Sequence, residues 1–149
     1  PTNLITSPGM FLDNRYHFSV ISLTNTKACF INMTIIRQLF GENKEFQKRF
    51  HYSVGERSVM LFSRFRNLIH KNMAGRLADA ILFLSNEIYE SPEFNMDLRR
   101  SDLAEYSNMT KESVSRILKE FKEQKLFQIE NDTARILDMN RLVQIARNG

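Results

Sequence analysis

Residues 108–121, NMTKESVSRILKEF, carry two opposed patterns at the spacing of a helix. Apolar residues at i, i+3, i+4 and i+7 predict a buried face made of Val114, Ile117, Leu118 and Phe121. Polar residues with the same spacing fall on the other side: Glu112, Ser115, Arg116 and Lys119. A chain with this stretch must pack one face of the helix and leave the other face for solvent or a partner.

The residues around this helix meet the requirements of a helix-turn-helix. Ala104 is small enough for a second helix to cross closely, and Asn108 tolerates the left-handed backbone of a tight turn. Thr110 can cap the second helix by accepting hydrogen bonds from free backbone N–H groups. Residues 99–107 and 111–125 are therefore predicted to form the two helices.

The following segment predicts a β-hairpin and a last helix. LFQIENDTARILD, residues 126–138, places ENDT between two short apolar stretches, and MNRLVQIAR completes the pattern. Two helices across a three-residue turn, followed by a hairpin, describe a winged helix-turn-helix.

A long helix is predicted for residues 43–71, which contain no proline. A short helix over residues 34–40 should end at Gly41, and Asn43 can cap the long one. Residues alternating by four and three form a heptad seam, with Phe62 just beside it. We interpret these as a dimer interface: Val54, Ser58, Leu61, Phe62, Phe65, Leu68 and Asn72. Packing of this helix on its own domain is the alternative.

A hinge is predicted at Asn72 and Met73. Asn72 can cap a second helix, residues 73–90, directly after the first, and Pro92 follows its end. A break between two successive helices lets the parts on either side turn relative to each other.

The N-terminal part predicts two strands over residues 14–32. Tyr16, Phe18 and Val20 alternate with polar residues, and LTNT interrupts the segment as a turn would. Two strands are not a domain by themselves. Because the chain also begins without Met, we expect a fragment of a longer protein. Cys29, among apolar neighbours, is expected to be buried.

Charge alone does not locate a binding surface. The formal charge of +4 and the pI near 9.4 suit a polyanion. Residues 44–76 carry eight Lys/Arg against two Glu, whereas residues 97–149 carry ten basic and nine acidic side chains. The C-terminal part, which holds the helix-turn-helix, is therefore close to neutral.

Several classes of function find no support in the sequence. One cysteine excludes an internal disulfide, and three dispersed histidines offer no metal site. The sequence has no glycine-rich phosphate loop or nucleophile elbow, so no enzyme is predicted. With no apolar run of eighteen residues and no signal peptide, a cytoplasmic protein without membrane contact is expected.

Residues 99–130, RRSDLAEYSNMTKESVSRILKEFKEQKLFQIE, resemble the DNA-binding signature of Crp/Fnr-type transcription regulators. The resemblance extends to NMAGRLADAILFL and, less specifically, to TKACFINMTIIRQLFGEN, which is similar to the end of the family's cyclic-nucleotide-binding-like β-roll. It implies a mainly α protein with small β elements. Residues 1–42 would end a truncated β-roll, 43–71 would form the dimerisation helix, and 72–149 the winged helix-turn-helix.

The resemblance also implies base-reading residues. The Fnr branch shows Glu-x-x-Ser-Arg, matched by Glu112, Ser115 and Arg116, and is associated with TTGA-type half-sites. The cyclic-AMP-receptor branch has Arg before the Glu and Gly at the Ser position, where this chain has Lys111 and Ser115. Arg116 can donate to guanine O6 and N7, Glu112 can accept from cytosine N4, and Ser115 can contact thymine.

Other polar residues near this helix are candidates for phosphate contacts, which orient a protein on DNA without reading sequence. They are Arg100, Thr110, Lys111, Lys119 and Lys122. The hairpin tip, residues 131–133, is a weaker candidate because Asp132 would repel phosphate.

No cofactor is expected. The family's cyclic-AMP binders carry an Arg-Ser pair where this chain has Tyr16 and His17, and the Fnr cysteine cluster is absent from this stretch, so the effector stays unnamed. The resemblance implies a bacterial homodimer on double-stranded, pseudo-palindromic DNA and admits RNA polymerase as a further partner. The alternative is a winged-helix protein-interaction module without sequence-specific DNA binding.

Overall fold

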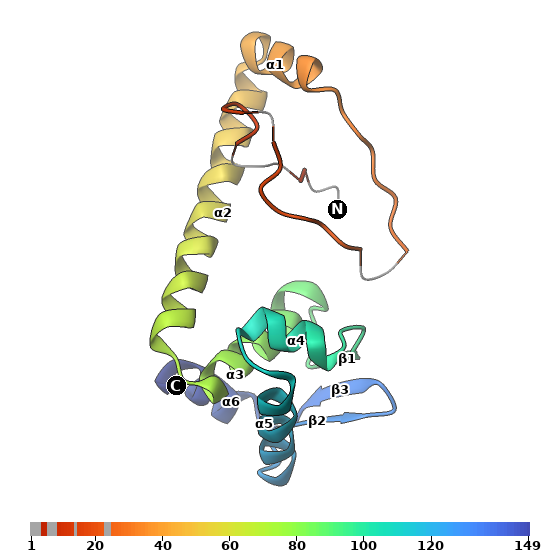
Figure 1. The fold of residues 1–149 in the computed structure, drawn as a ribbon, viewed down its shortest axis with the longest axis vertical. Helices are drawn as coiled ribbons and strands as arrows, with labels where there is room; N and C mark the ends of the chain where they lie inside the picture. Colours follow the sequence, from red (N-terminus) through yellow and green to blue (C-terminus); the bar gives the residue numbers. More distant parts are fainter. Residues whose placement is uncertain (1–3, 6–8, 14, 23–24) are drawn as a thin grey trace.

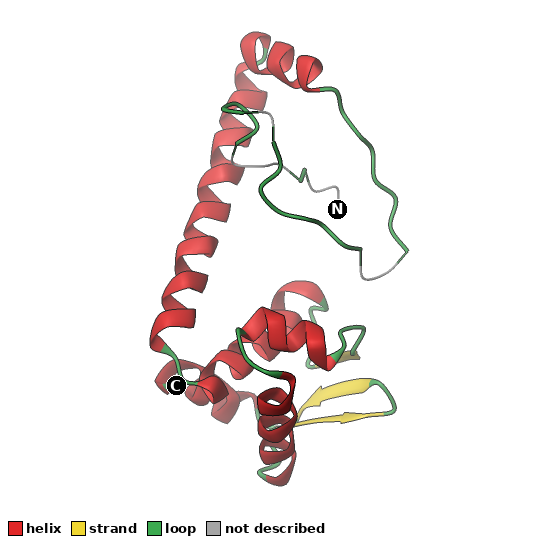
Figure 2. Ribbon diagram, viewed as in Figure 1, coloured by secondary structure: helices red, strands yellow, loops and turns green. Residues whose placement is uncertain are grey.

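The computed structural model describes residues 4–5, 9–13, 15–22 and 25–149 (Figure 1). Helices dominate the described residues, and the strands form one small sheet (Figure 2). The elements are α1 (Met33–Glu42), α2 (Lys44–His70), α3 (Met73–Phe83), the π-helical η1 (Leu84–Ile88), β1 (Glu93–Asn95), α4 (Arg100–Ser107), α5 (Lys111–Glu123), β2 (Phe127–Glu130), β3 (Thr133–Ile136) and α6 (Met139–Asn148). The predicted fold class is confirmed.

The 27-residue helix α2 forms a rod between α1 and the C-terminal domain (Figure 1). Asn43 begins it as predicted, because its side chain accepts the Phe46 N–H. None of the residues of α2 is buried. A helix with many apolar side chains and no buried face has surface left for a partner.

The break at Asn72 is confirmed. Lys71 and Asn72 have extended backbone, and the Asn72 side chain accepts the Gly75 N–H at 2.9 Å. Met73 is the first residue of α3. The predicted hinge therefore coincides with a change of helix direction.

One hydrophobic core holds α3, α4, α5, α6 and the sheet together. Its most buried large side chains include Leu77, Ile81, Leu103, Ile117, Phe127 and Leu142. The predicted hairpin forms as β2 and β3, with positive φ at both Asn131 and Asp132 in its turn. Strand β1, which the sequence did not predict, adds to the free edge of β3 and buries Phe94 opposite Ala134.

The two strands predicted for residues 14–32 are wrong for the part that the structure describes. Residues 15–22 and 25–32 are exposed and belong to no sheet; residues 14, 23 and 24 lie outside the described residues. Cys29 is exposed, not buried. Alternating apolar residues stabilise a strand only where it pairs and covers a core, and two isolated strands bury too little surface.

The corner between α1 and α2 is filled by aromatic rings. Phe40 contacts Phe50 with ring centroids 5.5 Å apart, and Phe11 packs on Phe40 at 5.1 Å. Phe11 also contacts Phe50 of α2, with ring centroids 5.7 Å apart. The assignment of residues 1–42 to a β-roll stays a prediction.

Candidate nucleic-acid interface

The turn between α4 and α5 has the predicted geometry. Asn108 adopts the left-handed conformation with φ of 50°, and the Met109 N–H donates to the Ala104 carbonyl at 2.9 Å. The Thr110 hydroxyl accepts the Ser113 N–H at 3.2 Å and so caps α5. Ala104 is buried where the two helices cross. The helix-turn-helix expected from these residues is confirmed.

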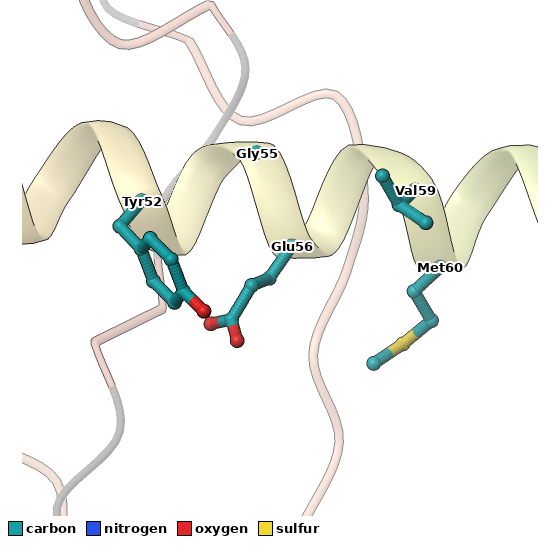
Figure 3. A pocket seen from close by; sticks show the side chains of 5 residues that line it. All are labelled: Tyr52, Gly55, Glu56, Val59 and Met60. Atoms are coloured by element: carbon teal, nitrogen blue, oxygen red, sulfur yellow. The ribbon is translucent and has the colours of Figure 1, made fainter.

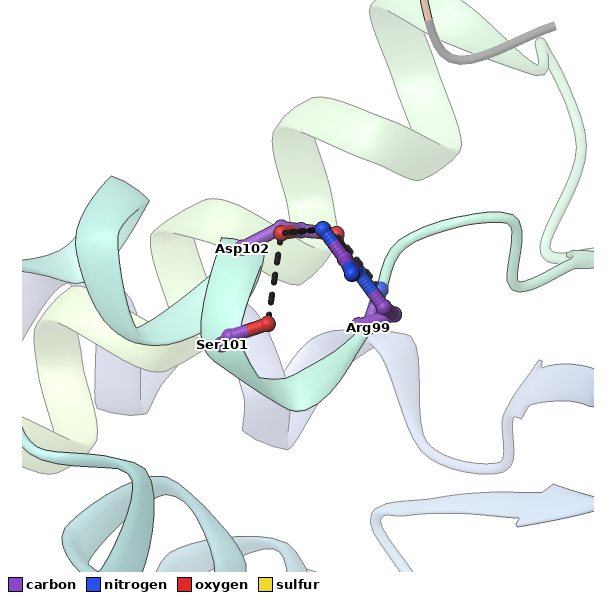
Figure 4. A network of polar contacts seen from close by, with 3 residues as sticks. All are labelled: Arg99, Ser101 and Asp102. Carbon is purple, nitrogen blue, oxygen red and sulfur yellow. Dashed lines mark hydrogen bonds and ion pairs between the residues drawn. The ribbon is translucent and has the colours of Figure 1, made fainter.

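The start of α4 is fixed by a small polar network (Figure 4). The Asp102 carboxylate accepts the Arg99 backbone N–H at 2.9 Å, and the Arg99 guanidinium and Ser101 hydroxyl also contact it. These bonds lower the pKa of Asp102, and the backbone bond from Arg99 contributes most. The carboxylate thus holds the first turn of the helix that supports α5.

Helix α5 presents the three base-reading candidates on one exposed face. Its apolar side is buried against the core through Val114, Ile117, Leu118 and Phe121. Glu112, Ser115 and Arg116 are consequently exposed on the other side, together with Lys119. The structure brings these candidates together as predicted; their contacts with bases remain a proposal.

Arg116 does not form the i, i+4 ion pair with Glu112 that a purely solvated helix face would favour. Arg116 Nη1 donates instead to Glu120 Oε1 at 2.8 Å. Glu112 lies in the first turn of α5, and its pKa is lowered first by its own backbone N–H and then by the Thr110 hydroxyl. Free N–H groups at a helix start attract a carboxylate, which explains why Glu112 turns toward them.

The phosphate candidates surround this face but differ in availability. Lys119 Nζ lies 3.9 Å from Glu123, and Lys122 Nζ lies 3.4 Å from Glu130. Arg100 and Lys111 are exposed and have no ion pair among the described residues. The Thr110 hydroxyl is engaged in its cap.

The three-stranded sheet carries a bidentate ion pair between two of its strands. Arg135 on β3 donates to both carboxylate oxygens of Glu93 on β1, at 2.9 and 2.8 Å. This contact lowers the pKa of Glu93 and raises that of Arg135. The pair joins strands 42 residues apart in the sequence, so no local pattern could have revealed it.

All of the dimer candidates except Asn72, the cap of α3, lie on α2, which extends away from α5 (Figure 1). Leu61 is 51% exposed, Phe62 74% and Phe65 53%, and Val54 is also exposed. Ser58 and Asn72 are exposed and Leu68 is half-buried. The seam is thus an uncovered apolar surface within this single chain.

Tyr52 and Val59, two helical turns apart on α2, form a second exposed apolar pair outside the seam, and each is at least 67% exposed. Ile69 is also exposed, but it lies two turns from Phe62 and so widens the seam. Gly55 leaves an open hollow beside Tyr52 and Val59, lined also by Glu56 and Met60 (Figure 3). A hollow on one exposed helix is a notch between side chains rather than an enclosed ligand site.

Polar contacts join α2 to the C-terminal domain across the break at Asn72. The Arg64 guanidinium lies 3.6 Å from the centroid of the Tyr106 ring and donates to the Tyr106 carbonyl at 2.7 Å. Lys71 pairs with Asp79 at 2.5 Å. No sequence pattern indicates the contact of Arg64 with Tyr106, because the two residues are 42 positions apart.

Within the described part of the chain, no group of three or more His, Cys, Asp or Glu side chains is placed to hold a metal ion. No helix among these residues is long and apolar enough to cross a membrane.

Comparison with known proteins agrees with this architecture. Residues 75–145 match the Crp-like helix-turn-helix domain. The transcriptional regulatory protein btr of Bordetella pertussis is 23% identical over 97% of this chain and 61% of its own length. The structure of FixK2 from Bradyrhizobium japonicum matches 77% of this chain and 59% of that one, with a TM-score of 0.71 and 16% identity. A CRP/FNR transcriptional regulator from Thermus thermophilus matches 70% and 56%, with a TM-score of 0.61 and 18% identity. The chain therefore spans less than two thirds of the length of these relatives.

Proposed function

We propose, on the premise that this chain belongs to the Crp/Fnr family of transcription regulators, that it binds DNA sequence-specifically as a homodimer through α5. The observation that carries the proposal is the exposed face of α5, where Glu112, Ser115 and Arg116 stand opposite a fully buried anchor face. The N-terminal part of the second helix in a helix-turn-helix enters the major groove. These side chains are the ones such a docking would bring to base edges.

The half-site that this set favours is of TTGA type. Arg116 would donate to guanine, Glu112 would accept from the cytosine amino group, and Ser115 would contact a thymine edge. Lys111 and Arg100, exposed beside the same face, would bind phosphates and orient the domain, with Lys119 and Lys122 joining them.

Pairing of two copies through the seam on α2 would give the site two-fold symmetry. Two recognition helices about 34 Å apart require an inverted repeat. The exposed side chains of Leu61, Phe62 and Phe65 support this pairing, because burial against a twin would remove them from water. A regulator of this family is typically not an enzyme. We propose the bacterial cytoplasm as its location and RNA polymerase as a further partner.

The test is selection of bound duplexes from a random pool by the purified chain at about 150 mM salt, followed by sequencing. Enrichment of TTGA with its inverted repeat is the expected result. Enrichment of a TGTGA-type site would support DNA binding but contradict the assignment to the Fnr branch. No enrichment by a folded sample would contradict the proposal.

A protein-interaction module is the second candidate. The near neutrality of residues 97–149 and the carboxylates paired with Arg116, Lys119 and Lys122 favour it. The two functions differ in salt dependence, because phosphate contacts make affinity fall steeply as salt rises. A protein-only module would bind no duplex at moderate salt.

A further inference from the structure

We propose that Glu120 is a specificity-determining residue that makes Arg116 favour a guanine edge over phosphate; this inference rests on the DNA-binding function proposed above. The two residues lie one turn apart on α5, and Arg116 Nη1 donates to Glu120 Oε1 at 2.8 Å. The side chains are 56% and 43% exposed. The pair therefore faces the space that a duplex would occupy.

The contact with Glu120 occupies only one side of the guanidinium. A guanidinium has five N–H donors in a rigid plane, and the described hydrogen bond to Glu120 uses Nη1. The edge formed by Nε and Nη2 has no carboxylate partner among the described ion pairs. Guanine offers two acceptors, O6 and N7, that fit such an edge. Glu120 thus restrains the side chain and leaves a base-reading edge available.

The charge of Glu120 has a separate consequence. A free arginine binds any phosphate, and this sequence-independent attraction supplies most non-specific DNA affinity. With a carboxylate at 2.8 Å, Arg116 is already paired, and an approaching phosphate meets a like charge. A guanine edge is neutral and suffers no such repulsion. The carboxylate therefore weakens phosphate binding by Arg116 more than base binding.

Glu123 provides a matched control on the same helix. Its carboxylate lies 3.9 Å from Lys119 Nζ, a looser contact with a side chain that has no planar fork. Replacing Glu123 by Gln removes the same charge without touching Arg116. A general change in the electrostatics of α5 would affect both variants, whereas control of base selection would affect only Glu120.

The experiment compares the full chain with its Glu120→Gln and Glu123→Gln variants. Affinity is measured by fluorescence anisotropy for the duplex selected from the random pool, for the same duplex with the half-site G·C pair replaced, and for a random duplex. We expect Glu120→Gln to reduce the preference for the selected over the replaced duplex by about two- to fivefold, the size expected for an exposed ion pair. Glu123→Gln should raise affinity for all three duplexes alike. In an Arg116→Ala background, Glu120→Gln should leave the preference unchanged.

The two ways of failing are distinguishable. If the wild type distinguishes the duplexes and Glu120→Gln keeps the same preference, or both variants lose it equally, the role of Glu120 is overturned while DNA binding stands. If the wild type shows no sequence preference, the proposed function fails and the role of Glu120 fails with it. If the pair only stabilises α5, Glu120→Gln would lower the melting temperature without altering the preference for the selected duplex.

Discussion

Arg116 and Lys119 lie one turn apart on α5, but their removal should have different effects on DNA binding. Arg116→Ala should cost about 1 to 3 kcal/mol on the selected site and relax preference at one base pair, because it removes donors to a base edge. Lys119→Ala should weaken binding to all duplexes alike, because phosphates are the same in every sequence. Affinities for selected and random duplexes measure both effects. Equal losses on the two duplexes for Arg116→Ala would contradict its role.

The ionisation of Glu112 gives a prediction for pH. Its pKa is lowered from the usual value by its own backbone N–H and by Thr110, so the group stays charged well below neutral pH. Preference at the cytosine it would contact should be constant between about pH 8 and 5.5. Because the folded pKa is depressed, the stability contributed by the charged group is present above the unfolded pKa. It is lost as pH falls through the folded pKa. Loss of preference near pH 6.5 would assign the contact to another group.

Substitutions of Asn108 test how much the left-handed turn of the helix-turn-helix contributes to stability. Its φ of 50° lies in the left-handed region, where a Cβ is strained unless the side chain compensates. Asn108→Ala should lower the free energy of unfolding by about 1 to 2 kcal/mol, whereas Asn108→Gly should be close to neutral. Urea denaturation compares them. Equal stability of the two variants would show that the backbone conformation there is not limiting.

The helix caps could be predicted from the sequence, but the ion-pair partner of Arg116 could not. Asn43, Asn72 and Thr110 were predicted as caps and are caps, because each bonds a backbone N–H within three residues of itself. The partner of Arg116 was not predicted, since Glu112 and Glu120 have the same spacing from it. The choice depends on the free N–H groups at the start of α5.

The helices and the β2–β3 hairpin were predicted well, whereas β1 was missed and the strands expected over residues 14–32 were wrong for the described part, for one physical reason. The heptad and 3.6-residue periods of α2 and α5 are properties of each segment alone. Strand β1 is three residues long and exists because β3 has a free edge, while residues 15–22 have alternating side chains but no strand to pair with. Whether a strand pairs depends on distant parts of the chain, and a local sequence pattern carries no information about them.

The contact between α2 and α4 should control the stiffness of the junction at Asn72. Arg64 binds both the ring and the carbonyl of Tyr106. Arg64→Ala should speed tryptic cleavage after Lys71 several-fold, because the junction opens more often when α2 is released. Arg64→Lys keeps the charge but not the planar group, so its cleavage rate should lie between those of the wild type and Arg64→Ala. The melting temperature of the C-terminal domain should not change, since its core does not include Arg64.

A cleavage rate that is the same in all three proteins would mean that other contacts fix the junction. The bond from Arg76 to the Leu68 carbonyl and the Lys71–Asp79 pair are the alternatives that the structure offers.

In the proposed dimer, the two chains would associate through an exposed surface of α2. Leu61→Glu should shift the protein toward monomer and abolish binding to the inverted repeat, because a charge would face its twin in the seam. Met60→Glu, on another side of α2 and also exposed, is the control. Sedimentation velocity with duplex binding measures both. If Leu61→Glu sediments as the wild type does, the interface would have to lie elsewhere, for example on the side of α2 that carries Tyr52 and Val59.

Helix α2 runs from the seam toward the C-terminal domain without interruption as far as His70. Every residue added to a continuous helix turns the C-terminal remainder of the chain by about 100°. In the proposed dimer, the number of α2 residues between Leu68 and His70 would therefore set the angle of each α5 about the axis of α2. One residue inserted there would leave the seam from Val54 to Leu68 unchanged and, in the proposed dimer, would point the two reading faces away from a common groove.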